Sequence, residues 1–81
     1  MVDTSVTVFS AADDEVPYDC WYAGLVVRDL GGGEIVVRPT RYKGGADGPW
    51  ETYTGVREIL ARVKGRDVEF VDTWPRRKAV D

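Results

Sequence analysis

The sequence predicts a single small α+β domain, in which a mainly antiparallel sheet packs one amphipathic helix on one of its faces. Two observations lead to this prediction. Two runs rich in β-branched residues surround a glycine cluster at residues 31–33, and a later stretch has apolar residues at helical spacing. A chain of 81 residues has room for one hydrophobic core. The expected element order over residues 1–81 is therefore β-β-β-(β)-α-β.

Residues 1–19 are expected to form the first strand and an acidic loop. Residues 4–10 alternate and are rich in β-branched side chains, which is typical of a strand. Pro17 disfavours both a helix and a central strand in the loop that follows. The first 19 residues hold five acidic side chains and no basic one, whereas the rest of the chain holds eleven basic and nine acidic ones. The net charge of −3 therefore belongs to the N-terminal quarter.

A β-hairpin is predicted over residues 20–42, with a reversal at residues 29–33 where glycines supply positive φ. If Arg28 pairs with Glu34, the odd-numbered side chains form the core face. The even-numbered face then gathers tyrosines and arginines, which anchor many interfaces. It is either an amphipathic solvent face or a partner-binding surface. The candidate partner-binding residues, extended just past this face, are Tyr22, Arg28, Arg38, Arg41, Tyr42 and Lys43.

The helix is predicted over residues 54–64. Its apolar side chains lie at i, i+3, i+4 and i+7, on one helical stripe: Val56, Ile59, Leu60 and Val63. Thr54 is placed to cap its N-terminus and Gly65 to cap its C-terminus. A last strand over residues 67–74 and a basic tail over residues 75–81 follow.

Four residues outside the hairpin are secondary candidates for partner binding: Trp50, Trp74, Arg76 and Arg77. The two tryptophans either cap the core of this small domain or anchor a partner. The two arginines belong to the basic tail, which is otherwise a solvated chain end.

The composition argues against catalysis, so we expect a non-enzymatic protein with no cofactor and no metal. The absence of histidine excludes Ser-His and Cys-His nucleophile pairs and histidine-ligated metals. The single Cys20 excludes an internal disulfide and has no neighbouring base to form a thiolate. The glycines at residues 31–33 join two strands, whereas a phosphate loop precedes a helix. The acids at residues 13–15 lack the alternating ligands of a calcium loop.

A cytoplasmic location is expected, with no membrane contact. The N-terminus lacks the basic and apolar regions of a signal peptide, and no apolar stretch is long enough to span a bilayer. A lone thiol fits a reducing compartment. Aspartate outnumbers glutamate, arginine outnumbers lysine, and asparagine and glutamine are absent. This composition is typical of proteins from salt-loving organisms or from GC-rich genomes.

These observations predict a small interaction domain that binds a protein partner, as a regulator or inhibitor, or that forms a homodimer through an unpaired strand edge. The alternative is a nucleic-acid-binding module that uses the Arg/Tyr face of the hairpin. The succession of a three-stranded sheet, Trp50, Thr52-Tyr53-Thr54 and an amphipathic helix resembles the arm-binding domains of phage integrases and a class of plant DNA-binding domains, which implies DNA binding. A pI near 4.8 argues against this alternative.

Overall fold

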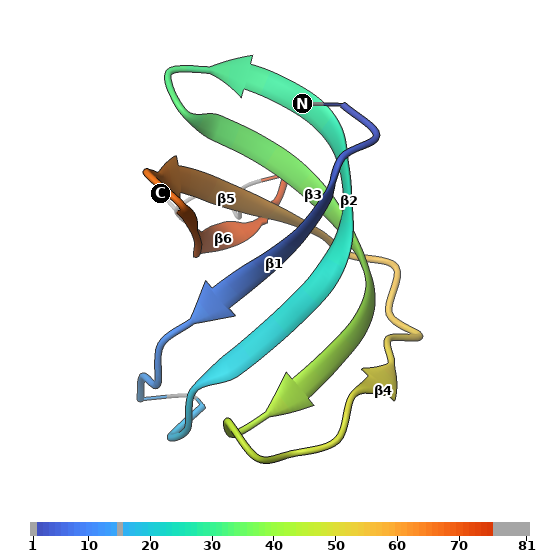
Figure 1. Cartoon of the computed structure of the whole chain (residues 1–81), viewed down its shortest axis with the longest axis vertical. Helices are drawn as coiled ribbons and strands as arrows, with labels where there is room; N and C mark the ends of the chain where they lie inside the picture. Colours follow the sequence, from blue (N-terminus) through green and yellow to red (C-terminus); the bar gives the residue numbers. More distant parts are fainter. Residues whose placement is uncertain (1, 15, 76–81) are drawn as a thin grey trace, which may run out of the picture.

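The computed structural model describes residues 2–14 and 16–75, and all regular secondary structure in these ranges is β-strand. The strands are β1 (Ser5–Ser10), β2 (Cys20–Gly31), β3 (Glu34–Gly44), β4 (Glu51–Thr52), β5 (Glu58–Lys64) and β6 (Asp67–Trp74). Antiparallel pairs join β1 to β2, β2 to β3, β3 to β5 and β5 to β6. A parallel pair between β6 and β1 then closes the cycle (Figure 1). The fold is a closed five-stranded β-barrel, and the predicted α+β class is wrong.

The predicted helix over residues 54–64 does not form, because β5 occupies most of that stretch. Ile59, Leu60 and Ala61 are consecutive and all buried, with Ile59 and Ala61 in the core cluster. A strand buried on both faces is a continuous apolar run, and a short run of this kind also matches a helical stripe. Val56, which would begin that stripe, is 93% exposed. Among the described residues, no helix is long and apolar enough to cross a membrane.

The β2–β3 hairpin reverses at Gly32 and Gly33, so the turn is shorter than the sequence predicted. Both glycines have positive φ, 63° and 82°, as a two-residue hairpin turn requires. Glu34 therefore pairs with Gly31, whereas the sequence predicted pairing with Arg28. Three irregularities in register follow along the hairpin.

These irregularities overturn the assignment of odd-numbered residues to the core. On β2 it is Val26 that lies in the core, whereas Leu25 is exposed. On β3 the residues that face the core change from odd-numbered to even-numbered along the strand. Val37 packs in the core, but further along it is Tyr42 that faces inward, opposite the inward-facing Tyr22. The extra residue that causes the change lies between the pairs Ala23–Arg41 and Gly24–Pro39.

The core fills the barrel interior with small and β-branched side chains from all strands of the barrel except β6, which adds partly buried ones. Its buried members are Val8, Val26, Ile35, Val37, Ile59 and Ala61, and the partly buried ones packed on them are Val6, Tyr22, Val63, Val68 and Phe70. Each barrel strand pairs with a neighbour on both sides over part of its length, which shortens the free edges of an open sheet. Among the described strands, open edges remain on the two-residue β4 and on the end of β2 past Val26, which pairs with β3 alone, so the homodimer by strand addition stays a prediction.

One apolar pair is fully buried outside the barrel interior. Val36 and Leu60 face each other across β3 and β5, and both have 0% exposure. In the neighbouring registers, Arg38 pairs with Glu58 at 3.0 Å on one side, and an Arg62–Glu34 ion pair of 3.3 Å lies on the other. The aliphatic stems of long charged side chains shield such apolar surface while their charged ends stay in water.

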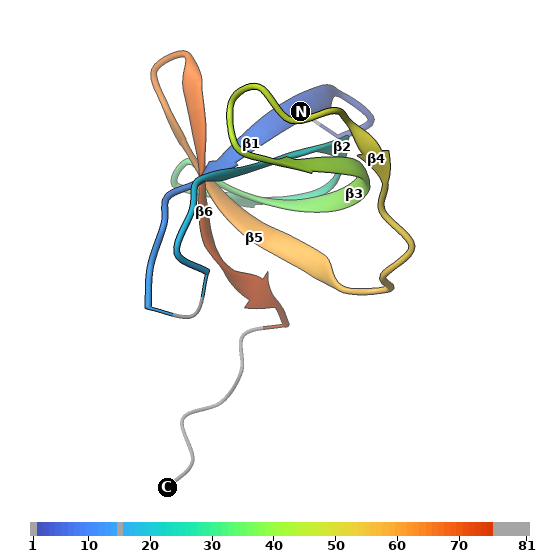
Figure 2. The same cartoon turned by 90° about the horizontal axis from the view of Figure 1, so that it is seen from below.

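The two loops at the lower end of the hairpin lie on opposite sides of it. The loop between β1 and β2 lies on the side of β5 and β6, and the loop between β3 and β4 lies on the other side (Figure 2). Each face of the hairpin end is therefore bordered by a different loop.

Candidate functional site

The six predicted hairpin residues do not share one face. At the end of the hairpin, Tyr22 pairs with Tyr42 on the inner face, toward the barrel interior. The adjacent register pairs Lys43 with Trp21, and these side chains point to the outer face because side chains alternate along a strand. Arg41 lies two residues from Lys43, so it shares that outer face. The predicted Tyr/Arg surface is thus divided between two sides of the sheet.

Arg28 and Arg38 lie further along the hairpin, past the change in register. Arg28 is opposite the buried Val36, and Arg38 is opposite Leu25. Arg38 donates from Nε and from one terminal nitrogen to the same carboxylate oxygen of Glu58, at 3.2 and 3.0 Å. The Arg38 guanidinium is therefore held by the barrel itself. Neither arginine lies with the two tyrosines.

A basic–aromatic patch forms on the outer face from Phe9, Trp21, Arg41, Lys43 and Trp50. The Lys43 ammonium lies 5.4 Å from the ring centroid of Trp21 and 5.1 Å from that of Trp50. The Arg41 guanidinium lies 5.4 Å from the Trp50 centroid, and the rings of Phe9 and Trp21 are 5.3 Å apart. Cation–π attraction at such distances holds the two cations against the indole rings.

The loop between β3 and β4 brings Trp50 onto this patch. Gly45 adopts a positive φ of 80° and its amide donates to the carbonyl of Asp19 at 2.8 Å, which starts the turn away from β3. Lys43 Nζ donates to the carbonyl of Ala46 at 3.2 Å. The same ammonium thus ties the loop to the strand and contacts two indoles. Trp50 remains 38% exposed.

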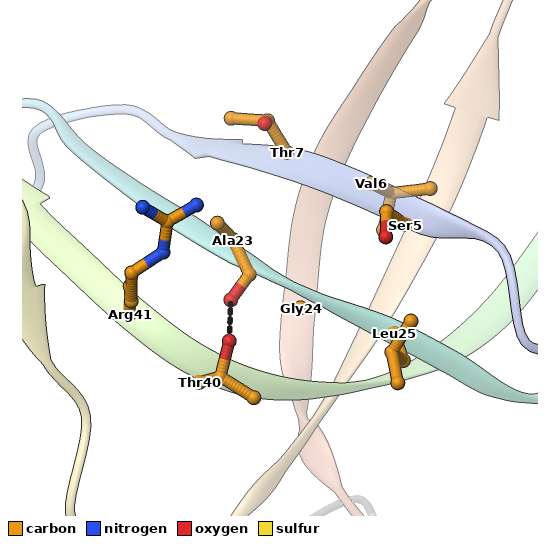
Figure 3. Close-up of a pocket in the computed structure, with 8 residues that line it drawn as sticks. All are labelled: Ser5, Val6, Thr7, Ala23, Gly24, Leu25, Thr40 and Arg41. Carbon is orange, nitrogen blue, oxygen red and sulfur yellow. Dashed lines mark hydrogen bonds between the residues drawn. The ribbon is translucent and has the colours of Figure 1, made fainter.

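Two hollows flank the basic–aromatic patch on the outer face. One, of about 310 Å³, contains Arg41, Ala23 and Thr7 among its lining residues (Figure 3). Thr40 Oγ1 donates to the carbonyl of Ala23 there at 3.3 Å. The other hollow, of about 520 Å³, lies against Phe9 and Trp21 on the opposite flank. The patch is therefore the centre of a longer uneven surface across β1, β2 and β3.

A third hollow, named the tyrosine hollow, lies on the inner face of the same hairpin end and has a volume of about 530 Å³. Its lining includes Tyr18, Cys20, Tyr22, Tyr42 and Glu51. Burial raises the pKa of the Cys20 thiol above its ordinary value of 9.0, and the carboxylates of Asp19 and Asp13 raise it further. Such a thiol stays protonated at neutral pH and is a poor nucleophile.

All four tyrosines of the chain converge here: Tyr18, Tyr22 and Tyr42 line the hollow, Tyr53 contacts two of them, and their proximity affects the pKa of Tyr22. Burial raises this pKa most, and the other groups that raise it are Cys20, Tyr53, Tyr18 and Tyr42. Tyr53 stands edge-on to the rings of both Tyr22 and Tyr42, with centroids 6.2 Å apart in each pair. These contacts connect residues from the loop after β1, from β2, from β3 and from the segment after β4.

The four secondary candidates for partner binding do not lie together in one site. Trp50 joins the basic–aromatic patch, whereas Trp74 is partly buried and pairs with Glu58 at the end of β6. Arg76 and Arg77, with the rest of the predicted basic tail, lie outside the described residues. The prediction that odd-numbered hairpin side chains form the core face applies to Trp21 as well, and the sequence indicated no functional role for Phe9, Tyr18 or Tyr53. A glycine in the middle of β2, Gly24, is the signal that could have indicated a change of face.

No family model, no curated protein and no solved structure matches the chain. Within residues 2–14 and 16–75, no three of the cysteine and carboxylate side chains gather in a way that would hold a metal ion.

Proposed function

We propose that the protein is a non-enzymatic interaction domain that binds a protein partner through the basic–aromatic patch. The observation that carries the proposal is the position of Lys43, whose ammonium lies against the two indoles of Trp21 and Trp50. Tryptophan and arginine are the residues that most often dominate binding energy at interfaces. Holding their side chains in place before binding lowers the entropy that association costs.

The chemistry of the patch favours a partner with carboxylates on its surface. The patch contributes two cations and no carboxylate, although the whole chain carries a net charge of −3. A partner carboxylate can pair with the Arg41 guanidinium while apolar side chains cover Phe9 and Trp50. The hollow beside Arg41 extends this surface, whereas the hollow beside Phe9 adds Arg66 together with the carboxylates of Asp67 and Glu69. We expect a protein of this kind to act as a regulator, an inhibitor or an assembly subunit.

The proposal extends to location and chemistry. The raised pKa of the Cys20 thiol supports a role without thiol catalysis. A single cysteine that stays reduced fits the cytoplasm, where we place the protein.

A nucleic acid is the competing partner, because indoles stack on bases and cations pair with phosphates. The net charge of −3 and the pI near 4.8 favour a protein, since affinity for nucleic acid rests on neutralising many phosphates. The two partners are separated by the experiment that follows.

The test is capture of partners from a host lysate by the immobilised protein, compared with two variants. Lys43→Glu/Trp50→Ala removes the centre of the patch. Arg57→Glu makes the same change of charge at an exposed residue outside the patch. We expect one protein to be retained at near-stoichiometric yield by the wild type and by Arg57→Glu, and lost with the double variant.

Two further measurements complete the test. Retention should persist after the lysate is treated with nuclease, whereas loss after treatment identifies nucleic acid as the partner. Sedimentation of the purified protein shows whether the captured partner is a second copy of the chain. A partner that binds the double variant as well as the wild type contradicts the proposal.

A further inference from the structure

The tyrosine hollow has a composition unlike that of the rest of the surface. Three aromatic rings, from Tyr18, Tyr22 and Tyr42, line it together with the carboxylate of Glu51. Its volume of about 530 Å³ lies within the range of small-molecule sites, about 300–1,000 Å³. The basic–aromatic patch lies on the opposite face of the hairpin and makes no use of these residues.

We propose that the tyrosine hollow binds an alkylated ammonium group, carried either by a methylated lysine side chain or by a small quaternary amine. Aromatic faces attract cations through the negative potential above the ring, and several rings around one cation add their contributions. The proposal is independent of the function proposed for the outer face.

The rings are held in place before any ligand arrives. Tyr53 contacts the rings of Tyr22 and Tyr42 at interplanar angles of 82° and 85°. Phe70 stacks on Tyr22 at a centroid distance of 6.4 Å, and this pair anchors the hollow to the barrel core. Tyr18 lies against Gly44, where a β-carbon would come within 2.9 Å of the tyrosine ring. Any larger residue at Gly44 would displace the Tyr18 ring.

The charge around the hollow favours a cation. Glu51 is opposite Tyr42 in the β3–β4 pair, so its carboxylate lies on the same side as the tyrosine rings. Asp19 directly precedes Cys20 in the acidic loop that borders the site, and its carboxylate, which accepts a hydrogen bond from the Ala12 amide at 2.9 Å, raises the pKa of the Cys20 thiol. No basic side chain is among the described residues that line the hollow. The nearest basic strand residues, Arg41 and Lys43, extend to the other face.

The lining also explains why the ammonium should be alkylated. An unmodified lysine ammonium is strongly hydrated and needs three hydrogen-bond acceptors when it leaves water. Besides the Glu51 carboxylate, the lining comprises three tyrosines, the protonated Cys20 thiol, two glycines and Val16, so a single anionic acceptor stands among phenol hydroxyls and apolar groups. Methyl groups replace the N–H donors and spread the charge over an apolar surface, so an alkylated cation loses less hydration on entering.

The experiment measures binding to the full chain by calorimetry and by amide chemical shifts. The probes are choline, its neutral isostere 3,3-dimethylbutan-1-ol, and one short peptide that carries either trimethyl-lysine or unmodified lysine. We expect choline or the trimethylated peptide to bind, the neutral isostere to bind at least about fivefold more weakly, and the unmodified peptide likewise. Which of the two cations binds more tightly identifies the source of the ammonium group.

Two variants locate the site. Tyr42→Leu and Glu51→Gln should each weaken binding of the cation about three- to tenfold, because each removes one attraction to the positive charge. Trp50→Leu is the matched control, since Trp50 and Tyr42 are similarly exposed, 38% and 36%, and border opposite faces of the hairpin end. It should leave cation binding unchanged.

Any of these outcomes overturns the inference: equal binding of the cation and its neutral isostere, unchanged affinity in both hollow variants, or loss of affinity in Trp50→Leu. Absence of binding by every probe also overturns it. Chemical shifts of the free variants check that each remains folded, so a loss of affinity reports on the site.

Discussion

Replacement of Gly24 by alanine should destabilise the barrel more than any other exchange of glycine for alanine in the hairpin. A β-carbon on Gly24 would overlap the carbonyl oxygen of Arg38 on the neighbouring strand and would lie 2.7 Å from Cα of Pro39. Both obstacles are backbone atoms, so no side-chain rotation relieves the overlap. The two strands must therefore move apart next to the extra residue of β3, where the core-facing residues of that strand change from odd-numbered to even-numbered.

The magnitude follows from two opposing effects. Forcing one carbon into a filled space costs about 1–3 kcal/mol, and more when the backbone has to move. Alanine also restricts the unfolded chain, which returns about 0.4–1 kcal/mol where the backbone conformation suits it. We expect a net loss of about 2 kcal/mol, which for a domain of this size lowers the melting temperature by about 10 °C.

Thermal and urea unfolding followed by circular dichroism measure the loss. Gly32→Ala is the control, because a β-carbon there has nothing within 4 Å but the residue has a φ of +63°. That variant should lose only about 1 kcal/mol, through backbone strain alone. If Gly24→Ala is as stable as the wild type, or loses less free energy of unfolding than Gly32→Ala, then β2 and β3 do not approach each other as closely as described at Gly24.

Three further predictions concern the core, the thiol and the composition. Leu60→Ala should lower the free energy of unfolding in urea by about 2–4 kcal/mol although Leu60 lies outside the barrel interior. Val56→Ala, at a 93% exposed site, should leave it unchanged, and equal losses in the two variants would contradict the burial of Leu60 against Val36. Because burial raises the pKa of Cys20 above 9.0, its thiolate forms at higher pH than usual, so alkylation by iodoacetamide at pH 8 should be slower than for a cysteine peptide and should still be rising above pH 9. If the composition reflects adaptation to salt, the free energy of unfolding should be higher in ~2 M than in ~0.1 M KCl, because salt screens the repulsion between clustered acidic charges. Equal stability at the two concentrations would refute adaptation to salt.

The strands near the start of the chain could be predicted because their pattern is local. Residues 4–10 alternate, and the glycines at residues 31–33 mark a reversal, so the structure has strands and a turn where the sequence indicated them. Residues 59–61 could not be assigned in this way. They are buried on both faces of a barrel strand, and an apolar run of that length fits a helical stripe equally well.

The candidate site could be predicted by residue type but not by face. Tyrosine, arginine and lysine of the hairpin end do lie in the two surfaces described, yet one extra residue on β3, between Pro39 and Arg41, places Tyr42 on the inner face and Arg41 on the outer face. Such bulges arise where long strands coil to close a barrel, which depends on strands far apart in the sequence. Trp50 reaches Lys43 through a loop whose path the sequence alone does not determine.

The division of the hairpin end into two faces is most directly tested by nuclear Overhauser contacts between side chains in the full chain. We predict contacts from the Tyr53 ring to the rings of Tyr22 and Tyr42, and from the ε-methylene protons of Lys43 to the indoles of Trp21 and Trp50. Contacts between the Tyr42 ring and the Trp50 indole, with none from Lys43 to either tryptophan, would place the tyrosines and the tryptophans on one face and contradict the account.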